Sequence, residues 1–228
     1  MSFKNLSVGR KIGAVFTIIS IAIAALGWFL TSEIGKLKDN ILILTDTSLP
    51  SIVLVKDMQA NATAIRRDQY YFISNIHRPD INTSLSSYNQ RLAEMDNQLA
   101  QYEETLWSEE DVRHFNAVAN AWKSYKSQKD IFIAAIKAKE TEKANDLAQN
   151  SLNDFTELDK SLQSLFELNL SYTAQDRLKT LDRVSQTNTL TIAGILLILV
   201  FMIAMTVFLT RQICQPLKTT IAMAERIA

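Results

Sequence analysis

Two long, uninterrupted apolar stretches dominate the pattern of hydrophobic and polar positions in this chain of 228 residues. The first covers residues 12–31 and the second covers residues 190–210, and neither contains a charged side chain. A helix rises about 1.5 Å per residue, so roughly 20 apolar residues are enough to cross the ~30 Å hydrocarbon layer of a membrane. We therefore predict two transmembrane helices, with residues 32–189 forming a large loop between them.

The basic residues beside these stretches predict the orientation of the chain. Five of them flank the stretches on the side away from the loop: Lys4, Arg10, Lys11, Arg211 and Lys218. Short basic flanks mark the cytoplasmic side of a membrane. Residues 1–11 and 211–228 should therefore be cytoplasmic, and the loop should lie outside. A cleaved signal peptide is the alternative for the first stretch, but its length and the lack of a small-x-small cleavage site favour an uncleaved anchor.

The loop contains almost none of the residues that tight turns require. No glycine occurs between Gly35 and Gly194, and the only prolines in that interval are Pro50 and Pro79. A sheet protein of this size would use glycine in its turns and bulges. The composition therefore favours a few long helices.

Apolar residues in the loop recur at steps of three and four, as on one face of a helix. The clearest stripe is Leu85, Tyr88, Leu92, Met95, Leu99, Tyr102 and Leu106. A second stripe is Val112, Phe115, Ala119, Trp122, Lys129, Phe132 and Ile136. Together with the flanking patterns, these stripes predict helices over about 33–75, 85–106 and 112–136, and from Thr141 onward.

Two details of these predicted helices bear on the architecture. Pro50 either kinks the first helix or follows a fresh start at Ser48, and the sequence allows both. The last helix has no breaker before the second apolar stretch, so helix and span should be continuous. The predicted fold is all-α: an antiparallel up-down-up-down four-helix bundle continuous with two transmembrane helices.

The residues that catalysis or metal binding would require are scarce. The only histidines, His77 and His114, are far apart in the sequence, and Cys214 is the only cysteine. No glycine-rich phosphate loop is present, and a formal net charge of zero gives no basic field for nucleic acid. We therefore predict no catalytic residue, no metal site, no cofactor and no nucleic-acid partner, and we expect that the chain is not an enzyme.

The candidate binding feature is a pair of adjacent arginines, Arg66 and Arg67. With Thr63 and Tyr70 they are neighbours at helical spacing and predict one polar and aromatic ridge. The planar fork of arginine suits carboxylate capture. The alternative is that both arginines pair with acids such as Asp68, Asp154 or Asp159 and only solubilise the bundle. Counting 1.5 Å per residue from the spans and the distal turns puts Asn153 and Thr156 level with Arg66.

Several motifs identify a family resemblance. They are Leu6-Ser7-Val8-Gly9-Arg10-Lys11-Ile12, Leu49-Pro50, Ile65-Arg66-Arg67, Ile213-Cys214-Gln215-Pro216-Leu217 and Ala224-Glu225-Arg226-Ile227-Ala228. With the bundle layout, they resemble the N-terminal sensor part of bacterial methyl-accepting chemotaxis receptors. The resemblance implies that residues 211–228 begin a HAMP linker, with Arg211, Pro216 and Glu225 taking part in signal transmission.

This resemblance also implies a function. The chain would be a homodimeric chemoreceptor of the bacterial inner membrane whose periplasmic bundle binds an amino acid or organic acid, an anionic or zwitterionic ligand. Helix-one arginines and helix-four residues would hold the ligand at the dimer interface, which maps onto Arg66 or Arg67 and onto Asn153 and Thr156. A chemotaxis kinase and its coupling protein would be reached through a cytoplasmic part beyond residue 228.

Three alternatives remain open at this stage. The same module occurs on histidine kinases and diguanylate cyclases, a periplasmic binding protein could replace the free ligand, and a membrane-tethered helical scaffold would show the same stripes. The HAMP-like junction favours a sensor over a scaffold, which has no use for it.

Overall fold

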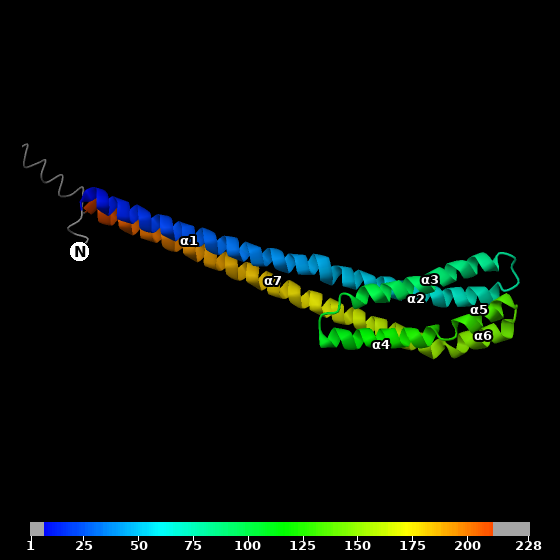
Figure 1. The fold of residues 1–228 in the computed structure, drawn as a ribbon. Coiled ribbons are helices and arrows are strands. Elements are labelled where there is room, and N and C mark those ends of the chain that lie inside the picture. Colours follow the sequence, from blue (N-terminus) through cyan, green and yellow to red (C-terminus); the bar gives the residue numbers. More distant parts are fainter. Residues whose placement is uncertain (1–6, 212–228) are drawn as a thin grey trace, which may run out of the picture. The chain divides into compact units, whose positions relative to one another are not determined.

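The computed structural model describes residues 7–211, and Figure 1 shows its helices. Within that range the chain is helical apart from short turns and contains no strand. The chain divides into two compact units. One is Leu42–Arg177, and the other combines the described residues up to Ile41 with those from Leu178 onward.

The unit Leu42–Arg177 is a four-helix bundle, which confirms the predicted fold. The bundle consists of four rods, each made of one or two helices, and the rods follow one another in the sequence (Figure 1). The first two rods are α2 and α3. The third consists of α4 and α5, and the fourth consists of α6 and the first part of α7. The bounds are α2 Leu49–Ser74, α3 Ile81–Glu103, α4 Glu109–Lys126, α5 Lys129–Lys137, α6 Thr141–Asn150 and α7 Leu152–Leu209. Short turns join consecutive rods, as expected for antiparallel neighbours.

The stripe on α3 is buried in the bundle core. Six of its seven members are buried, and the seventh, Leu106, is half-buried just beyond the end of the helix. The burial of Tyr88 and Met95, at 1% and 0% exposure, confirms that the three- and four-residue spacing marks the inward face. Burying such side chains stabilises the fold by about 1.5–3 kcal/mol each.

The predicted stripe on α4 is wrong by one residue at two positions, Val112 and Ala119. Val112 is 38% exposed, whereas Asp111 is 2% exposed and faces the core. The buried face of α4 steps from Asp111 to Phe115, Val118 and Trp122. Ser108 caps the helix by accepting a hydrogen bond from the Asp111 backbone N–H at 3.1 Å. Asp111 can point inward because Tyr102 donates a hydrogen bond to its carboxylate at 2.8 Å.

The chain remains helical through Pro50 by widening one turn. α1 (Val8–Ile43) passes into the π-helix η2 (Leu44–Ser48), and the Leu49 N–H bonds the Leu44 carbonyl. Pro50 lies in the first turn of α2, where its missing N–H is least harmful. The sequence left a kink or a fresh start open; the structure has a continuous helix with a π turn.

The last rod is broken where the sequence predicted continuity. α6 ends at Asn150, and Ser151 separates it from α7, which begins at Leu152. The helix that runs into the second apolar stretch therefore begins at Leu152, not near Thr141. The prediction failed because no glycine or proline marks this break.

The second unit contains the apolar parts of α1 and α7. Glu33 and Thr187 are within hydrogen-bonding distance at 3.4 Å, and Gly194 lies where a Cβ would meet Leu26 at 3.1 Å. Both helices are long and apolar enough to cross a membrane. Most of their large apolar side chains in this unit are exposed, for example Leu197 at 71%.

Candidate functional site

Arg66 on α2 lies inside the bundle rather than on its surface. It is 6% exposed, and its Nη1 donates to the Ala148 carbonyl at 2.8 Å and to the Ser151 hydroxyl at 3.0 Å. Ala148 belongs to the last turn of α6, whose final carbonyls have no partner within the helix. The arginine therefore caps the C-terminal end of α6, where a cation is favoured by the helix dipole.

Gln69 and two tyrosines extend this polar contact across the core. Arg66 Nη1 donates to Gln69 Oε1 at 3.1 Å, and the Tyr125 hydroxyl donates to the same oxygen at 3.0 Å. Gln69 Nε2 donates to the Tyr88 hydroxyl at 3.2 Å. We call Arg66, Gln69, Tyr88, Tyr125 and Ser151 the Arg66 cluster. It joins all four rods of the bundle.

The ionisation of the two tyrosines follows from their burial. Loss of hydration raises the pKa of Tyr88 to about 12 and raises the pKa of Tyr125 further. Both hydroxyls therefore keep their protons at neutral pH. They act in the cluster as neutral hydrogen-bonding groups.

The charge of Arg66 is not balanced by a neighbouring acid. In the described part of the chain no carboxylate lies within 4.0 Å of its guanidinium, and its hydrogen-bond acceptors are neutral. Its Cζ lies 4.7 Å from the centre of the Tyr70 ring and 5.8 Å from that of Phe155. These aromatic faces stabilise the cation where it is shielded from water.

Arg67, the neighbouring arginine, has the opposite environment. Its side chain is 72% exposed, and its Nε reaches the Asp68 carboxylate only at 4.0 Å. Asp68 instead approaches Arg91 on α3, with Nε and Oδ2 3.1 Å apart. That contact is an ion pair without a hydrogen bond, because the Arg91 Nε–H does not point at an acceptor at a suitable angle. Arg67 is therefore the accessible guanidinium of the pair.

The remaining predicted ligand residues are on the bundle surface. Thr63, Asn153 and Thr156 are exposed, and Tyr70 is 39% exposed. The hydroxyls of Thr63 and Thr156 donate to carbonyls of their own helices, Gln59 and Leu152. Tyr70 accepts a hydrogen bond from Arg66 Nη2 at 2.7 Å, so it connects the buried arginine to the surface. A ligand role for these residues and for both arginines stays a prediction.

The contacts of Arg66 show which part of the fourth rod lies closest to it. Asn153 and Thr156 were placed level with Arg66, and the contacts of Arg66 run from Ala148 to Phe155. The predicted single ridge is divided, however, because Arg66 faces inward while Thr63 and Arg67 face solvent. Consecutive residues of a helix differ by about 100° in direction, so Arg66 and Arg67 cannot share a face.

Gln69, Tyr125 and Ser151 also belong to the Arg66 cluster, although none of them is among the predicted site residues. Tyr88 was expected only as a core residue. The available signal was a polar side chain at a core spacing: Gln69 follows Ile65 by four residues and precedes Phe72 by three, and both of these are buried.

The predicted signal-transmission residues lie at or beyond the end of the described range. Arg211 is its last residue and is exposed. Pro216 and Glu225 lie outside the described residues, so their predicted roles stay predictions.

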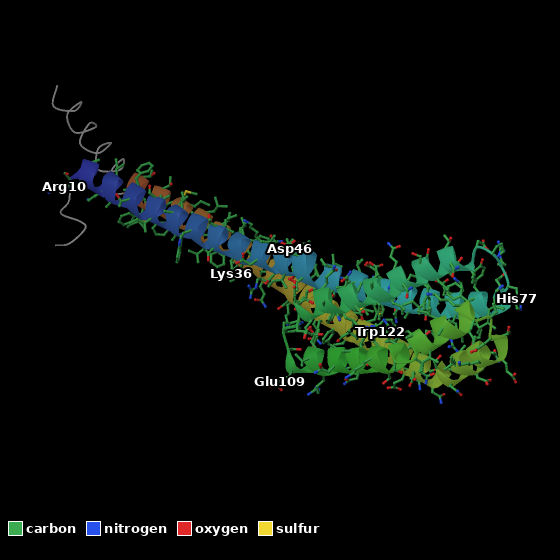
Figure 2. All side chains as sticks on the ribbon, turned by 45° about the vertical axis from the view of Figure 1, so that its right-hand side comes forward. Arg10, Lys36, Asp46, His77, Glu109 and Trp122 are labelled. Atoms are coloured by element: carbon green, nitrogen blue, oxygen red, sulfur yellow. The ribbon has the colours of Figure 1, made fainter. Side chains whose placement is uncertain are left out.

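The two histidines lie far apart within the bundle. His77 is in the turn after α2, at the opposite end of the bundle from Glu109, where α4 begins (Figure 2). His114 is one turn further along α4. Within residues 7–211 no group of three His, Cys, Asp or Glu side chains could hold a metal ion.

The sequence of the chain matches a known family. A family model for the four-helix-bundle sensory module for signal transduction matches residues 5–183. The chain belongs to this family of sensory modules.

A named relative points in the same direction. The chain is 25% identical over 153 residues to a protein of Acetivibrio thermocellus whose name assigns it to the sensory transducers. The match covers 65% of this chain and 27% of the relative, so the chain spans about a quarter of that protein's length.

Proposed function

We propose that this chain is the sensor region of a transmembrane chemoreceptor. Its bundle binds a small anionic or zwitterionic molecule outside the cytoplasm, and α7 passes the response to a HAMP linker and a kinase-control domain. The observation that carries this proposal is α7 itself. One unbroken helix of 58 residues includes the core residues Leu158, Leu162 and Leu165 and the second membrane-length stretch.

The proposed ligand surface is the exposed face of α2 that carries Thr63, Arg67 and Tyr70, together with Asn153 and Thr156 on α7. Arg67 supplies an accessible fork for a carboxylate, because its own acid is 4.0 Å away. Arg66 lies behind this surface and acts through Tyr70. Exposed apolar side chains on α2, such as Leu49 and Val53 at 45% and 57% exposure, support a second copy packing beside it.

The mechanism follows from a shift between two arrangements of the bundle. A ligand that favours one arrangement changes its population by its difference in affinity for the two. Packed helices can move by about 1–2 Å without losing their interdigitation. A displacement of α7 would then reach Arg211 and, along the chain, Pro216, which has no backbone N–H to donate to a helix.

The binding step can be tested with the full chain in lipid nanodiscs. Calorimetry against organic acids and amino acids should yield a ligand whose affinity falls at least tenfold in Arg67→Ala. Arg78→Ala removes an exposed arginine in the turn after α2 and should leave binding unchanged. Equal binding by both variants would show that the ligand surface is misassigned. A chain that ignores every small molecule but captures a periplasmic binding protein would replace direct binding.

The transmission step can be tested where α1 and α7 touch. Leu26→Cys and Gly194→Cys, in a Cys214→Ser background, place two thiols at the contact between the helices. Ligand should change the rate of disulfide formation between them if α7 moves against α1. An unchanged rate here and at pairs one turn away would contradict displacement of α7.

A further inference from the structure

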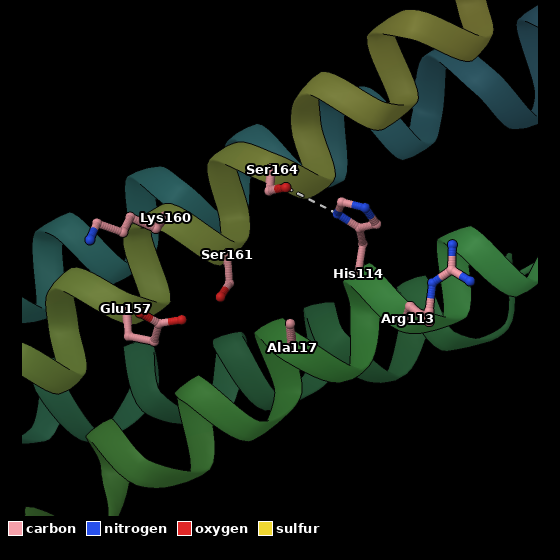
Figure 3. A pocket seen from close by; sticks show the side chains of 7 residues that line it. All are labelled: Arg113, His114, Ala117, Glu157, Lys160, Ser161 and Ser164. Atoms are coloured by element: carbon pink, nitrogen blue, oxygen red, sulfur yellow. Dashed lines mark hydrogen bonds between the residues drawn. The ribbon is translucent and has the colours of Figure 1, made fainter.

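A polar groove lies between α4 and α7 on the surface of the bundle, away from α2. Its volume is about 390 Å³, within the range of small-molecule sites. Figure 3 shows the side chains that line it, which come from both helices. They are Arg113, His114, Ala117, Glu157, Lys160, Ser161 and Ser164.

Hydroxyl and imidazole groups form the middle of this groove. His114 Nδ1 and Ser164 Oγ are 3.1 Å apart and join α4 to α7 (Figure 3). If Ser164 donates this hydrogen bond, the other ring nitrogen carries the proton and is a donor. Ser161 is 8% exposed, and its side-chain hydroxyl forms no hydrogen bond with the described residues. The middle of the groove therefore offers polar groups to a bound molecule.

Charges of opposite sign lie towards the two ends. Arg113 is towards one end, and the Glu157 carboxylate at the other end turns into the space between the helices (Figure 3). Lys160 also belongs to the Glu157 end, but its side chain extends away from α4 (Figure 3). Among residues 7–211, none of these three charges has an ion-pair partner. An acid and a base thus face one groove without neutralising each other.

The spacing along α7 sets the length of the molecule that both ends can hold. Glu157 and Ser164 are seven residues apart, or about 10 Å along the helix axis. The α-ammonium and α-carboxylate of an amino acid lie on one carbon, so this pair of groups cannot engage both ends at once. A dicarboxylate would place one of its charges against Glu157.

We propose that this groove binds a short linear zwitterion, such as a dipeptide or an ω-amino acid. Its carboxylate lies towards Arg113 and His114, and its ammonium lies towards Glu157 and Ser161. The site is independent of the surface around Arg67, because it uses α4 in place of α2. It is complete within one copy of the chain.

Calorimetry of the full chain in nanodiscs tests this proposal with five probes of defined charge. Glycylglycine and 5-aminopentanoate should bind. Glycine, glutarate and 1,5-diaminopentane should bind at least tenfold more weakly, because each lacks the length or one of the two charges. Binding of glutarate as tight as that of 5-aminopentanoate, or no binding by either zwitterion, would overturn the proposal.

Variants at the two ends provide the second arm. Arg113→Gln and Glu157→Gln should each weaken 5-aminopentanoate at least tenfold, while Arg78→Gln, in the turn after α2, should not. The double variant Arg113→Glu, Glu157→Arg reverses the polarity, and a linear zwitterion can turn round, so binding should partly return. If the single variants bind normally, or if only Arg67→Gln weakens binding, the zwitterion is not held in this groove.

Discussion

Arg66 and Arg67 are adjacent in the sequence but should differ sharply in their contribution to stability. Arg66→Ala would remove the charged donor from the Ser151 hydroxyl and from the Ala148 carbonyl, which would keep only its hydrogen bond from Ser151 Oγ. It should lower the free energy of unfolding by about 2–3 kcal/mol. Arg67→Ala removes an exposed side chain and should change it by less than about 0.5 kcal/mol. Denaturant unfolding followed by circular dichroism measures both. Equal values would contradict a capping role for Arg66.

Asp111 should make the stability of the bundle depend on pH in an unusual direction. Its burial raises its pKa, and the hydrogen bond from Tyr102 only partly opposes this. A raised folded-state pKa means that the folded chain binds the proton more readily than the unfolded chain does. The contribution is present below the unfolded-state pKa and is lost as pH rises through the folded-state pKa. Asp111→Asn should therefore gain stability relative to the original chain as pH rises from acid to neutral.

Asp80 provides the matched control for that experiment. Its hydrogen bond from Arg78 lowers its pKa, so its contribution is present at neutral pH and is lost as pH falls. Asp80→Asn should lose stability relative to the original chain as pH rises through the acid range, the opposite trend. Denaturant titrations at a series of pH values measure both differences. A downward trend for Asp111→Asn would mean that the folded bundle favours the ionised carboxylate.

At the scale of the helix, Lys139 ends α5 in a strained conformation. Its φ is 62°, in the left-handed region, and its N–H bonds the Ile136 carbonyl while the Glu140 N–H bonds the Ala135 carbonyl. These two bonds form a Schellman motif, in which glycine is favoured at the left-handed position. Lys139→Gly should stabilise the bundle by about 1 kcal/mol.

The same substitution two residues earlier should have the opposite sign. Lys137 lies in α5 with an ordinary helical backbone, so Lys137→Gly should destabilise by about 0.5–1 kcal/mol. Thermal unfolding of the two variants measures both changes in stability. Since each variant loses one lysine, the difference between them reports the effect of the backbone conformation at position 139. A destabilised Lys139→Gly would show that the lysine side chain matters more than the backbone strain.

The elements differ in how far the sequence could predict them. The stripe of α3 was readable because each side chain faces a core that it shares with every neighbouring rod. The break at Ser151 was not, because what stabilises it is Arg66, 85 residues away in the sequence. For the same reason the sequence could find the arginine pair but not decide which one faces inward. The hydrogen-bond acceptors of Arg66 lie on α6 and at Ser151, far from it in the sequence, and no local pattern records such contacts.

For the whole molecule, the exposed apolar side chains of α1 and α7 indicate which solvent surrounds these two helices. Phe16 is 65% exposed, Trp28 78%, Leu197 71% and Val200 66%. A surface of this extent is unfavourable in water but is satisfied by lipid, and both helices keep their backbone hydrogen bonds within themselves. The exposure and the length of the helices together support insertion of both into a membrane.

A membrane-impermeant maleimide can test this insertion and its orientation, because Cys214 is the only natural thiol. In cells with a permeabilised outer membrane, Cys214 should react only after the inner membrane is broken. In a Cys214→Ser background, Gln90→Cys on the exposed face of α3 should react at once, since the bundle is expected in the periplasm. Leu197→Cys should resist labelling until detergent and denaturant expose it, because lipid keeps the thiol protonated and out of contact with water. Immediate labelling of Cys214 with protection of Gln90→Cys would reverse the topology, and labelling of Leu197→Cys in intact cells would show that α7 does not cross the membrane.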